Sequence, residues 1–154
     1  ESCEVSLDFH ARFQAKGKKY RYIIYNSRFP SAMLRKRAYH VSYNLDVEGM
    51  KKAASYFTGT HDFFTFMATG SSVKTTVRTI TGVSLEKKDN ILEFEICGNG
   101  FLYNMVRIIA GTLVEVGMGR IKADDIPDII KSKDRKKAGR TAPAHGLYLV
   151  EVYY

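Results

Sequence analysis

Residues 91–114 read ILEFEICGNGFLYNMVRIIAGTLV, and within this stretch the spacing of the apolar side chains changes. In 91–97 apolar and charged residues alternate, which is typical of a strand with one buried face. Beyond Gly98-Asn-Gly100 the apolar residues continue with a single charge, Arg107, near their middle. The stretch therefore predicts a strand followed by a largely buried helix from about Gly100 to Gly117.

The same alternation assigns the two faces of the strand. Glu93 and Glu95 are expected to face away from the core, and the residues between and beside them to face it. The expected core residues of this strand are Leu92, Phe94 and Ile96. A second strand is predicted over 76–86, joined to the first by the short hairpin link 87–90.

Further elements are predicted on either side of this hairpin. Residues 18–25 are rich in aromatic and β-branched side chains and predict a strand with Tyr20, Tyr22 and Ile24 on one face. Apolar residues at helical spacing predict a helix over about 47–57, with Asn44 or Asp46 as its N-cap. The spaced residues are Val47, Met50, Ala54 and Phe57, and Gly59 is the expected stop. Residues 147–153 predict a closing strand.

Two shorter segments are assigned by their local residues. Asp124 is expected to cap a short helix that tolerates Pro127 in its first turn. The inward residues of that helix would be Ile126, Ile129 and Ile130. His61-Asp62 is expected to form a turn next to three core phenylalanines, Phe63, Phe64 and Phe66.

The order β-α-β-β-α-β predicts an α+β fold of the ferredoxin-like kind, an antiparallel sheet with helices on one face. No repeat or internal boundary divides the chain. Residues 1–15 show no clear pattern of helix or strand and are expected to be an entering arm. Residues 16–154 are expected to form one domain. A fold of this kind hosts many unrelated activities, so it does not define function.

The charge of the chain is positive and unevenly placed. The 154 residues carry a formal net charge of +8, with nine Lys or Arg against three acids in 1–40 and eight against four in 120–140. Two such blocks suit a polyanion such as nucleic acid, although two solvated lysine-rich loops would give the same count. No apolar run approaches the ~20 residues that a bilayer requires.

The first residues and the cysteines of the chain add two further expectations. The chain begins at Glu1 with neither Met nor a signal segment, which suggests a piece of a longer protein. Cys3 and Cys97 stand apart without the spacing of a zinc site, so free thiols in a reducing cytoplasm are expected.

Self-contained catalytic motifs are weak in this sequence. The four histidines are His10, His40, His61 and His145, and no two of them are spaced as a metal-binding pair. Asp8 and His10 lie two residues apart on an extended stretch, which is insufficient to define an acid–base pair. The glycines at 98 and 100 lack the Lys and the spacing of a phosphate-binding loop. No metal site is predicted.

Rings and cations alternate around the first predicted strand. Tyr20 and Tyr22 lie among four cations, Lys16, Lys18, Lys19 and Arg21. This arrangement suits the stacking of bases beside phosphates. A half-buried sheet face would use the same tyrosines, so both interpretations stay open at this point.

Arg107 raises a question of charge. A guanidinium keeps its proton, and a buried charge without a partner is costly. Glu115 lies about 12 Å farther along the helix axis, too far for a direct contact, and Glu93 and Glu95 are expected to face away. Either Arg107 extends to solvent along its stem, or its partner is an acid outside this chain.

Five segments together resemble the TruA-type tRNA pseudouridine synthases. They are DFHARF (8–13), KKYRYIIYN (18–26), GTHDF (59–63) with Phe66, GFLYNMVRIIAG (100–111) with the following Glu115-Val-Gly117, and TAPAHGLYL (141–149). The resemblance implies a cytoplasmic homodimer that converts uridine to pseudouridine in the anticodon arm of tRNA, at expected tRNA positions 38–40, without a cofactor. It also implies that 16–154 is the C-terminal half of a subunit with two related halves.

The resemblance assigns roles to individual residues. Arg107 would form an ion pair with the catalytic aspartate, Tyr20 would stack on the target base, and Leu147 would pack on its other side. The tRNA backbone would follow a basic path formed by His10, Arg12, Lys16, Lys18, Lys19 and Arg21.

The aspartate itself belongs to a Gly-Arg-Thr-Asp motif of the other half and is absent from this chain. Gly139-Arg-Thr-Ala142 shares three letters with that motif but has Ala142 in place of the acid. The chain alone is therefore expected to be inactive. Two other functions remain open, a non-catalytic RNA-binding module of the same fold and a dimerisation domain.

Overall fold

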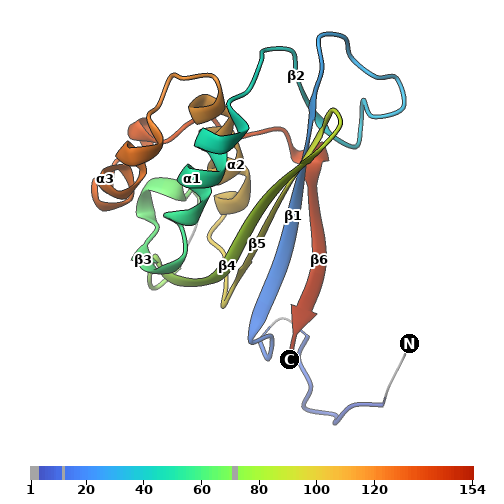
Figure 1. Cartoon of the computed structure of the whole chain (residues 1–154). Helices are drawn as coiled ribbons and strands as arrows, with labels where there is room; N and C mark the ends of the chain where they lie inside the picture. The colour runs from blue at the N-terminus through green and yellow to red at the C-terminus, as the bar shows by residue number, and fades with distance from the viewer. Residues whose placement is uncertain (1–3, 12, 71–72) are drawn as a thin grey trace.

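The computed structural model describes residues 4–11, 13–70 and 73–154. Strand β1 (Gly17–Asn26) forms the centre of the sheet, because it pairs with other strands along both edges (Figure 1). β5 (Ile91–Gly98) runs antiparallel along one edge. The other edge is shared by β6 (Leu147–Tyr153), which is antiparallel, and the short β2 (Tyr39–Val41), which is parallel.

The hairpin partner of β5 is β4 (Val77–Lys88), and β3 (Gly59–Asp62) extends the sheet beyond β4. Helix α1 (Val47–Ser55) follows β2, and α2 (Met105–Gly117) follows β5. The strands β6-β1-β5-β4 with these two helices have the β-α-β-β-α-β order, so the expected α+β class and element order are confirmed. The sheet is mixed rather than wholly antiparallel because β2 runs parallel to β1. β2 and β3 are too short for a pattern of period two to reveal them.

All three helices lie on one face of the sheet, and α3 (Ile126–Lys131) completes their layer (Figure 1). The core between the layers contains Tyr22, Phe94 and Ile108, each with no exposed surface. Helix α2 is buried on nearly every side, which explains its almost continuous apolar sequence. The predicted inward face of β5 is confirmed, because Leu92, Phe94 and Ile96 are fully buried.

The helix starts differ in part from the expectation. Asp46 caps α1 as predicted, and its Oδ1 accepts a hydrogen bond from Gly49 N at 3.0 Å. Helix α2 begins at Met105 rather than near Gly100, because Asn104 adopts a left-handed backbone with φ of 58° that interrupts the helical path. Asp125, not Asp124, precedes α3. The Asp124 carboxylate instead accepts hydrogen bonds from Lys52 of α1 and from Tyr56, which directly follows that helix.

The prediction of a turn at His61-Asp62 was wrong. Both residues belong to β3, where His61 lies opposite Arg78. A 3-10 turn follows directly, and it buries Phe63 and Phe66 but leaves Phe64 42% exposed, so Phe64 is not a core residue. Within the described residues, no helix is long and apolar enough to cross a bilayer.

Candidate active site

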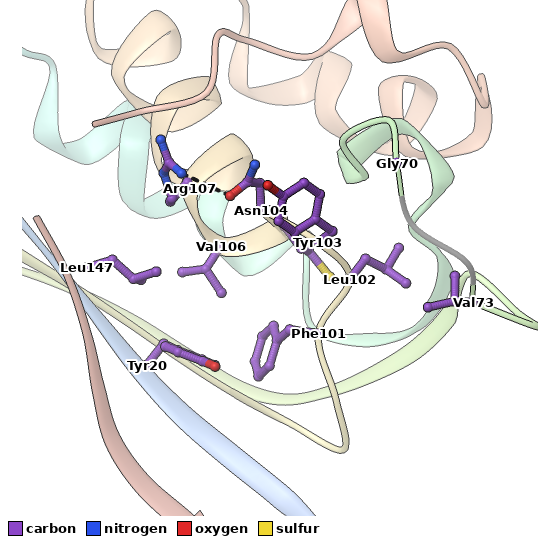
Figure 2. Close-up of a pocket in the computed structure, with 11 residues that line it drawn as sticks. Tyr20, Gly70, Val73, Phe101, Leu102, Tyr103, Asn104, Val106, Arg107 and Leu147 are labelled. Carbon is purple, nitrogen blue, oxygen red and sulfur yellow. Dashed lines mark hydrogen bonds between the residues drawn. The ribbon is translucent and has the colours of Figure 1, made fainter. Parts of the chain in front are cut away.

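A cleft of about 520 Å³ opens between β1, the start of β6 and the segment that leads into α2 (Figure 2). Tyr20 of β1 and Leu147 of β6 form one side of it, and Phe101, Asn104 and Arg107 form another. The structure therefore brings together all three residues that the sequence assigned to catalysis. They come from points 40 or more residues apart along the chain.

Arg107 is partly buried in the first turn of α2, and uncharged acceptors fix its guanidinium. Nε donates to the carbonyl oxygen of Ala142 at 2.8 Å, and Nη1 donates to Oδ1 of Asn104 at 2.9 Å (Figure 2 draws the second bond). In the described part of the chain no carboxylate forms an ion pair with it. These acceptors orient the guanidinium without neutralising it. A planar cation held in this way is suited to a two-pronged bond with a carboxylate.

The segment that carries Ala142 packs directly on α2. Glycines at the contact make this possible, because a Cβ at Gly111 would overlap the carbonyl oxygen of Arg140 and one at Gly139 would lie 2.7 Å from Thr112 Cα. Thr112 Oγ1 also accepts a hydrogen bond from Gly139 N at 2.9 Å. The close approach places the Ala142 carbonyl within reach of Arg107.

Arg135 braces the same segment from the other side. Its guanidinium donates to Gly139 O at 2.9 Å and to Thr141 Oγ1 at 3.2 Å. Burial lowers the pKa of Arg135, although a guanidinium remains charged at any physiological pH. Main-chain and side-chain oxygens together position this cation, as they position Arg107.

Tyr20 presents an aromatic wall to the cleft. Its ring packs edge-on against Phe101, with centroids 5.1 Å apart and an interplanar angle of 87°. Burial raises the pKa of the Tyr20 hydroxyl, which therefore stays protonated at neutral pH. Figure 2 shows Leu147 and Val106 around the same space as the ring. A flat, uncharged ring of the size of a nucleobase would find apolar surface here on more than one side.

Tyr22 has a structural role instead. It is fully buried, and its hydroxyl donates to Pro143 O at 2.6 Å. Burial, as the largest cause, raises its pKa well above the ordinary value for a tyrosine. This bond ties β1 to the segment that holds Arg107.

The predicted basic path divides between the two faces of the sheet. Lys18 alternates with Tyr20 on the helix side, whereas Lys19 and Arg21 lie on the open side. There Lys19 Nζ lies 2.6 Å from Glu95 Oε2, and Arg21 Nη2 lies 2.7 Å from Glu95 Oε1. The expectation that Glu93 and Glu95 face away from the core is therefore confirmed, and both pair with cations of β1.

The remaining predicted RNA contacts precede β1. Lys16 is exposed, and its backbone N–H donates to Tyr153 O at 2.7 Å. His10 belongs to the arm and its ring packs against Phe13 with centroids 4.2 Å apart. Arg12 lies outside the described residues.

Three residues of the candidate site were not predicted from the sequence, namely Phe101, Asn104 and Ala142. Phe101 and Asn104 lie within the segment used for the family resemblance, and Asn is a residue that tolerates a left-handed backbone. The contribution of Ala142 is a main-chain carbonyl, which no residue type reveals. Among the described residues, no three His, Cys, Asp or Glu side chains gather where a metal ion could bind.

The chain is similar in sequence to known proteins. Residues 53–154 match the family model described as tRNA pseudouridine synthase. The tRNA pseudouridine synthase A of Acetivibrio thermocellus is 71% identical over 154 residues, covering 100% of this chain and 63% of that protein. The protein of the same name from Ruminiclostridium cellulolyticum is 59% identical over 152 residues, covering 98% of this chain and 62% of that protein.

The fold and the cleft alone do not define the class of protein, but the extensive sequence match identifies it as an RNA-modifying one. The chain belongs to the tRNA pseudouridine synthase family. It spans about 62–63% of the length of these curated relatives.

Proposed function

We propose that this chain is the C-terminal part of a tRNA pseudouridine synthase subunit and that it forms one wall of the active cleft. The observation that carries the proposal is the state of Arg107. Its guanidinium is oriented by Ala142 and Asn104, has no carboxylate partner in the described chain, and lines the same cleft as Tyr20. A cation that is prepared in this way requires a counter-ion.

The counter-ion is the catalytic aspartate of the other half of the subunit. A neighbouring guanidinium lowers the pKa of a carboxylate and keeps it ionised at neutral pH. A two-pronged bond also sets the direction of the carboxylate, which a single lysine would not do. The role of Arg107 is therefore to hold the aspartate ionised and aimed into the cleft.

Tyr20 and Leu147 hold the base of the target uridine. In the isomerisation the bond between the ribose and a ring nitrogen breaks, and a bond from the ribose to a ring carbon forms, so the base must turn while it is detached. Apolar walls on the two faces of the ring confine it during this turn. The ring carbon gives up its proton, and the freed nitrogen gains one, so the conversion is balanced without a cofactor.

The whole protein acts on the anticodon arm of tRNA, as a homodimer in the cytoplasm. Support comes from the excess of positive charge, which suits a polyanion. Lys16, Lys18, His10 and Arg12 contact the RNA backbone near the cleft. Lys19 and Arg21 join them by exchanging their glutamate partners for phosphates.

Two measurements test this function. The 154-residue chain alone should form no pseudouridine in an unmodified tRNA transcript, whereas the full-length protein should. In the full-length protein, Arg107→Ala should lower kcat by about 10²–10³, the usual loss for a preorganised electrostatic group. A non-catalytic RNA-binding module would lose only the affinity of about one phosphate contact. A dimerisation domain would show no salt-dependent affinity for RNA.

A further inference from the structure

The loop of residues 27–38, which connects β1 to β2, concentrates positive charge. This loop, called the basic loop below, contains Arg28, Arg35, Lys36 and Arg37 and no acid. Its flanks do not compensate for this charge, because neither Asp nor Glu occurs between Phe9 and Leu45. The basic loop therefore carries four cations with no acid near it in the sequence.

The four cations are also unpaired in the structure. All four are exposed, and none forms an ion pair with any residue in 4–11, 13–70 or 73–154. Several other cations of the chain are paired with acids. Lys19 and Arg21 pair with Glu93 and Glu95, and Lys133 pairs with Asp62. The basic loop thus groups four cations of which none is paired with an acid among the described residues.

Hydrogen bonds give the loop a defined shape. The backbone N–H groups of Arg37 and Ala38 both donate to Leu34 O, at 2.9 and 3.0 Å. The hydroxyl of Tyr148 on β6 donates to Arg37 O at 2.8 Å and ties the loop to the sheet. In Figure 1 the loop projects beside the start of β6, on the side of the molecule away from α3. The cations are therefore presented on a fixed backbone.

Rings lie beside these cations. Arg35 borders a recess of about 290 Å³ whose wall includes Tyr25 and His40. Lys36 and Arg37 border a shallower hollow together with Tyr148. Cations beside accessible rings are typical of surfaces that bind the backbone and unpaired bases of RNA.

We propose that the basic loop is a second RNA-binding surface, on which Arg28, Arg35, Lys36 and Arg37 contact phosphates outside the active cleft. The proposal rests on the proposed function in taking the RNA to be tRNA. The loop lies at the far end of β1 from Tyr20, since the five residue steps from Tyr20 to Tyr25 span about 17 Å of extended strand. Its contacts therefore position the tRNA without touching the target base.

The test removes two charges from the loop of the full-length protein. Lys36→Gln/Arg37→Gln is compared with Lys51→Gln/Lys52→Gln, which removes two charges of α1 that lie outside both basic blocks and pair with Glu48 and Asp124. The probe is an unmodified tRNA transcript, and its Kd is measured over a range of salt concentrations. Binding constants for RNA fall as salt rises, so the slope of log K against log salt is negative. In the loop variant this slope should be shallower by about 1.4–1.8, because each lost phosphate contact contributes about 0.7–0.9. The control should keep the wild-type slope.

The rate of pseudouridine formation at saturating tRNA should be the same in the loop variant and the wild type. A loop variant with the slope of the control would overturn the second surface, while its unchanged rate would leave the proposed function standing. A loop variant that keeps the slope but becomes monomeric by sedimentation would show a protein interface instead, which also overturns it. A wild-type protein that neither binds nor isomerises tRNA would overturn both proposals. Matching thermal unfolding of the two variants excludes a folding defect.

Discussion

Arg107 and Ala142 are joined by two hydrogen bonds. Arg107 Nε donates to Ala142 O at 2.8 Å, and Ala142 N donates to Arg107 O at 3.1 Å. The side chain and the backbone of the same arginine are thus fixed by one residue from 35 positions away. Because the guanidinium is oriented before any acid arrives, it can bind a carboxylate with little further loss of conformational freedom.

The contact between α2 and the segment around Ala142 predicts the effect of Gly111→Ala. In a helix interior Ala is favoured over Gly by about 1 kcal/mol, so propensity alone would make this change stabilising. The new Cβ would overlap the Arg140 carbonyl, however, and main chain cannot move aside as a flexible side chain does. We expect a net loss of about 1–3 kcal/mol in the free energy of unfolding, measured by urea denaturation of the chain.

Gly82→Ala provides the matched control, because a Cβ at Gly82 would meet no atom within 4 Å. It should unfold within about 0.5 kcal/mol of the wild type. In the full-length protein Gly111→Ala should also slow pseudouridine formation more than it weakens tRNA binding. Equal stability of the two variants would contradict the tight contact.

The hydroxyl of Tyr22 predicts a second stability effect. Tyr22→Phe leaves the packing of the ring intact but removes the donor to Pro143 O. We expect a loss of about 0.5–1.5 kcal/mol, the net contribution of one hydrogen bond, because the Pro143 carbonyl is only partly buried. Since the pKa of Tyr22 is raised by burial, the loss should be the same from pH 6 to 9. Tyr153→Phe, whose hydroxyl is exposed and bonded to Glu151, should change the thermal midpoint little.

Tyr20 allows the ring and the hydroxyl to be separated. In the full-length protein, Tyr20→Phe should retain most of the tRNA affinity, because the ring and its contact with Phe101 remain. Tyr20→Ala should weaken binding by about 1–3 kcal/mol, the usual value of one stacked base. Filter binding with an unmodified tRNA transcript measures both. An affinity of Tyr20→Ala equal to that of the wild type would mean that no base stacks on this ring.

Glu95 predicts a dependence of stability on pH. Its pKa is lowered from the ordinary 4.5, chiefly by the hydrogen bond from Lys19. A carboxyl whose pKa is lower in the folded state contributes stability above its unfolded pKa and loses it as the pH falls through the folded pKa. The free energy of unfolding of the wild type should therefore exceed that of Glu95→Gln. The difference should be constant near neutral pH and shrink below pH 4.5. The difference should be below about 1 kcal/mol, as for partly exposed pairs.

Thermal unfolding between pH 3 and 8 measures this difference. Glu86→Gln is the control, since Glu86 is exposed and has no ion pair among the described residues. Its stability relative to the wild type should vary little over the same range. A Glu95→Gln difference that grows toward low pH would contradict the assigned sign.

The strands and the buried helix were predictable because their patterns are local. Period-two alternation identified the inward faces of β1 and β5, and a long apolar run identified α2. The family resemblance also singled out Arg107, Tyr20 and Leu147, which the structure places around one cleft. The start of α2 was missed because the left-handed backbone of Asn104 interrupts the helical path, and no periodic pattern of apolar residues marks such a position.

The sequence alone was thus sufficient to predict the fold class and the family. It also singled out an arginine with no expected acid partner in the same chain. Only the tertiary structure decided which atoms hold that arginine and which cations remain unpaired. Lys19, Arg21 and the basic loop look alike as sequence, yet Glu93 and Glu95 pair with the first two and no described acid pairs with the loop. The difference depends on the register between strands that lie 74 residues apart, and such a register follows from packing of the whole sheet rather than from any local pattern.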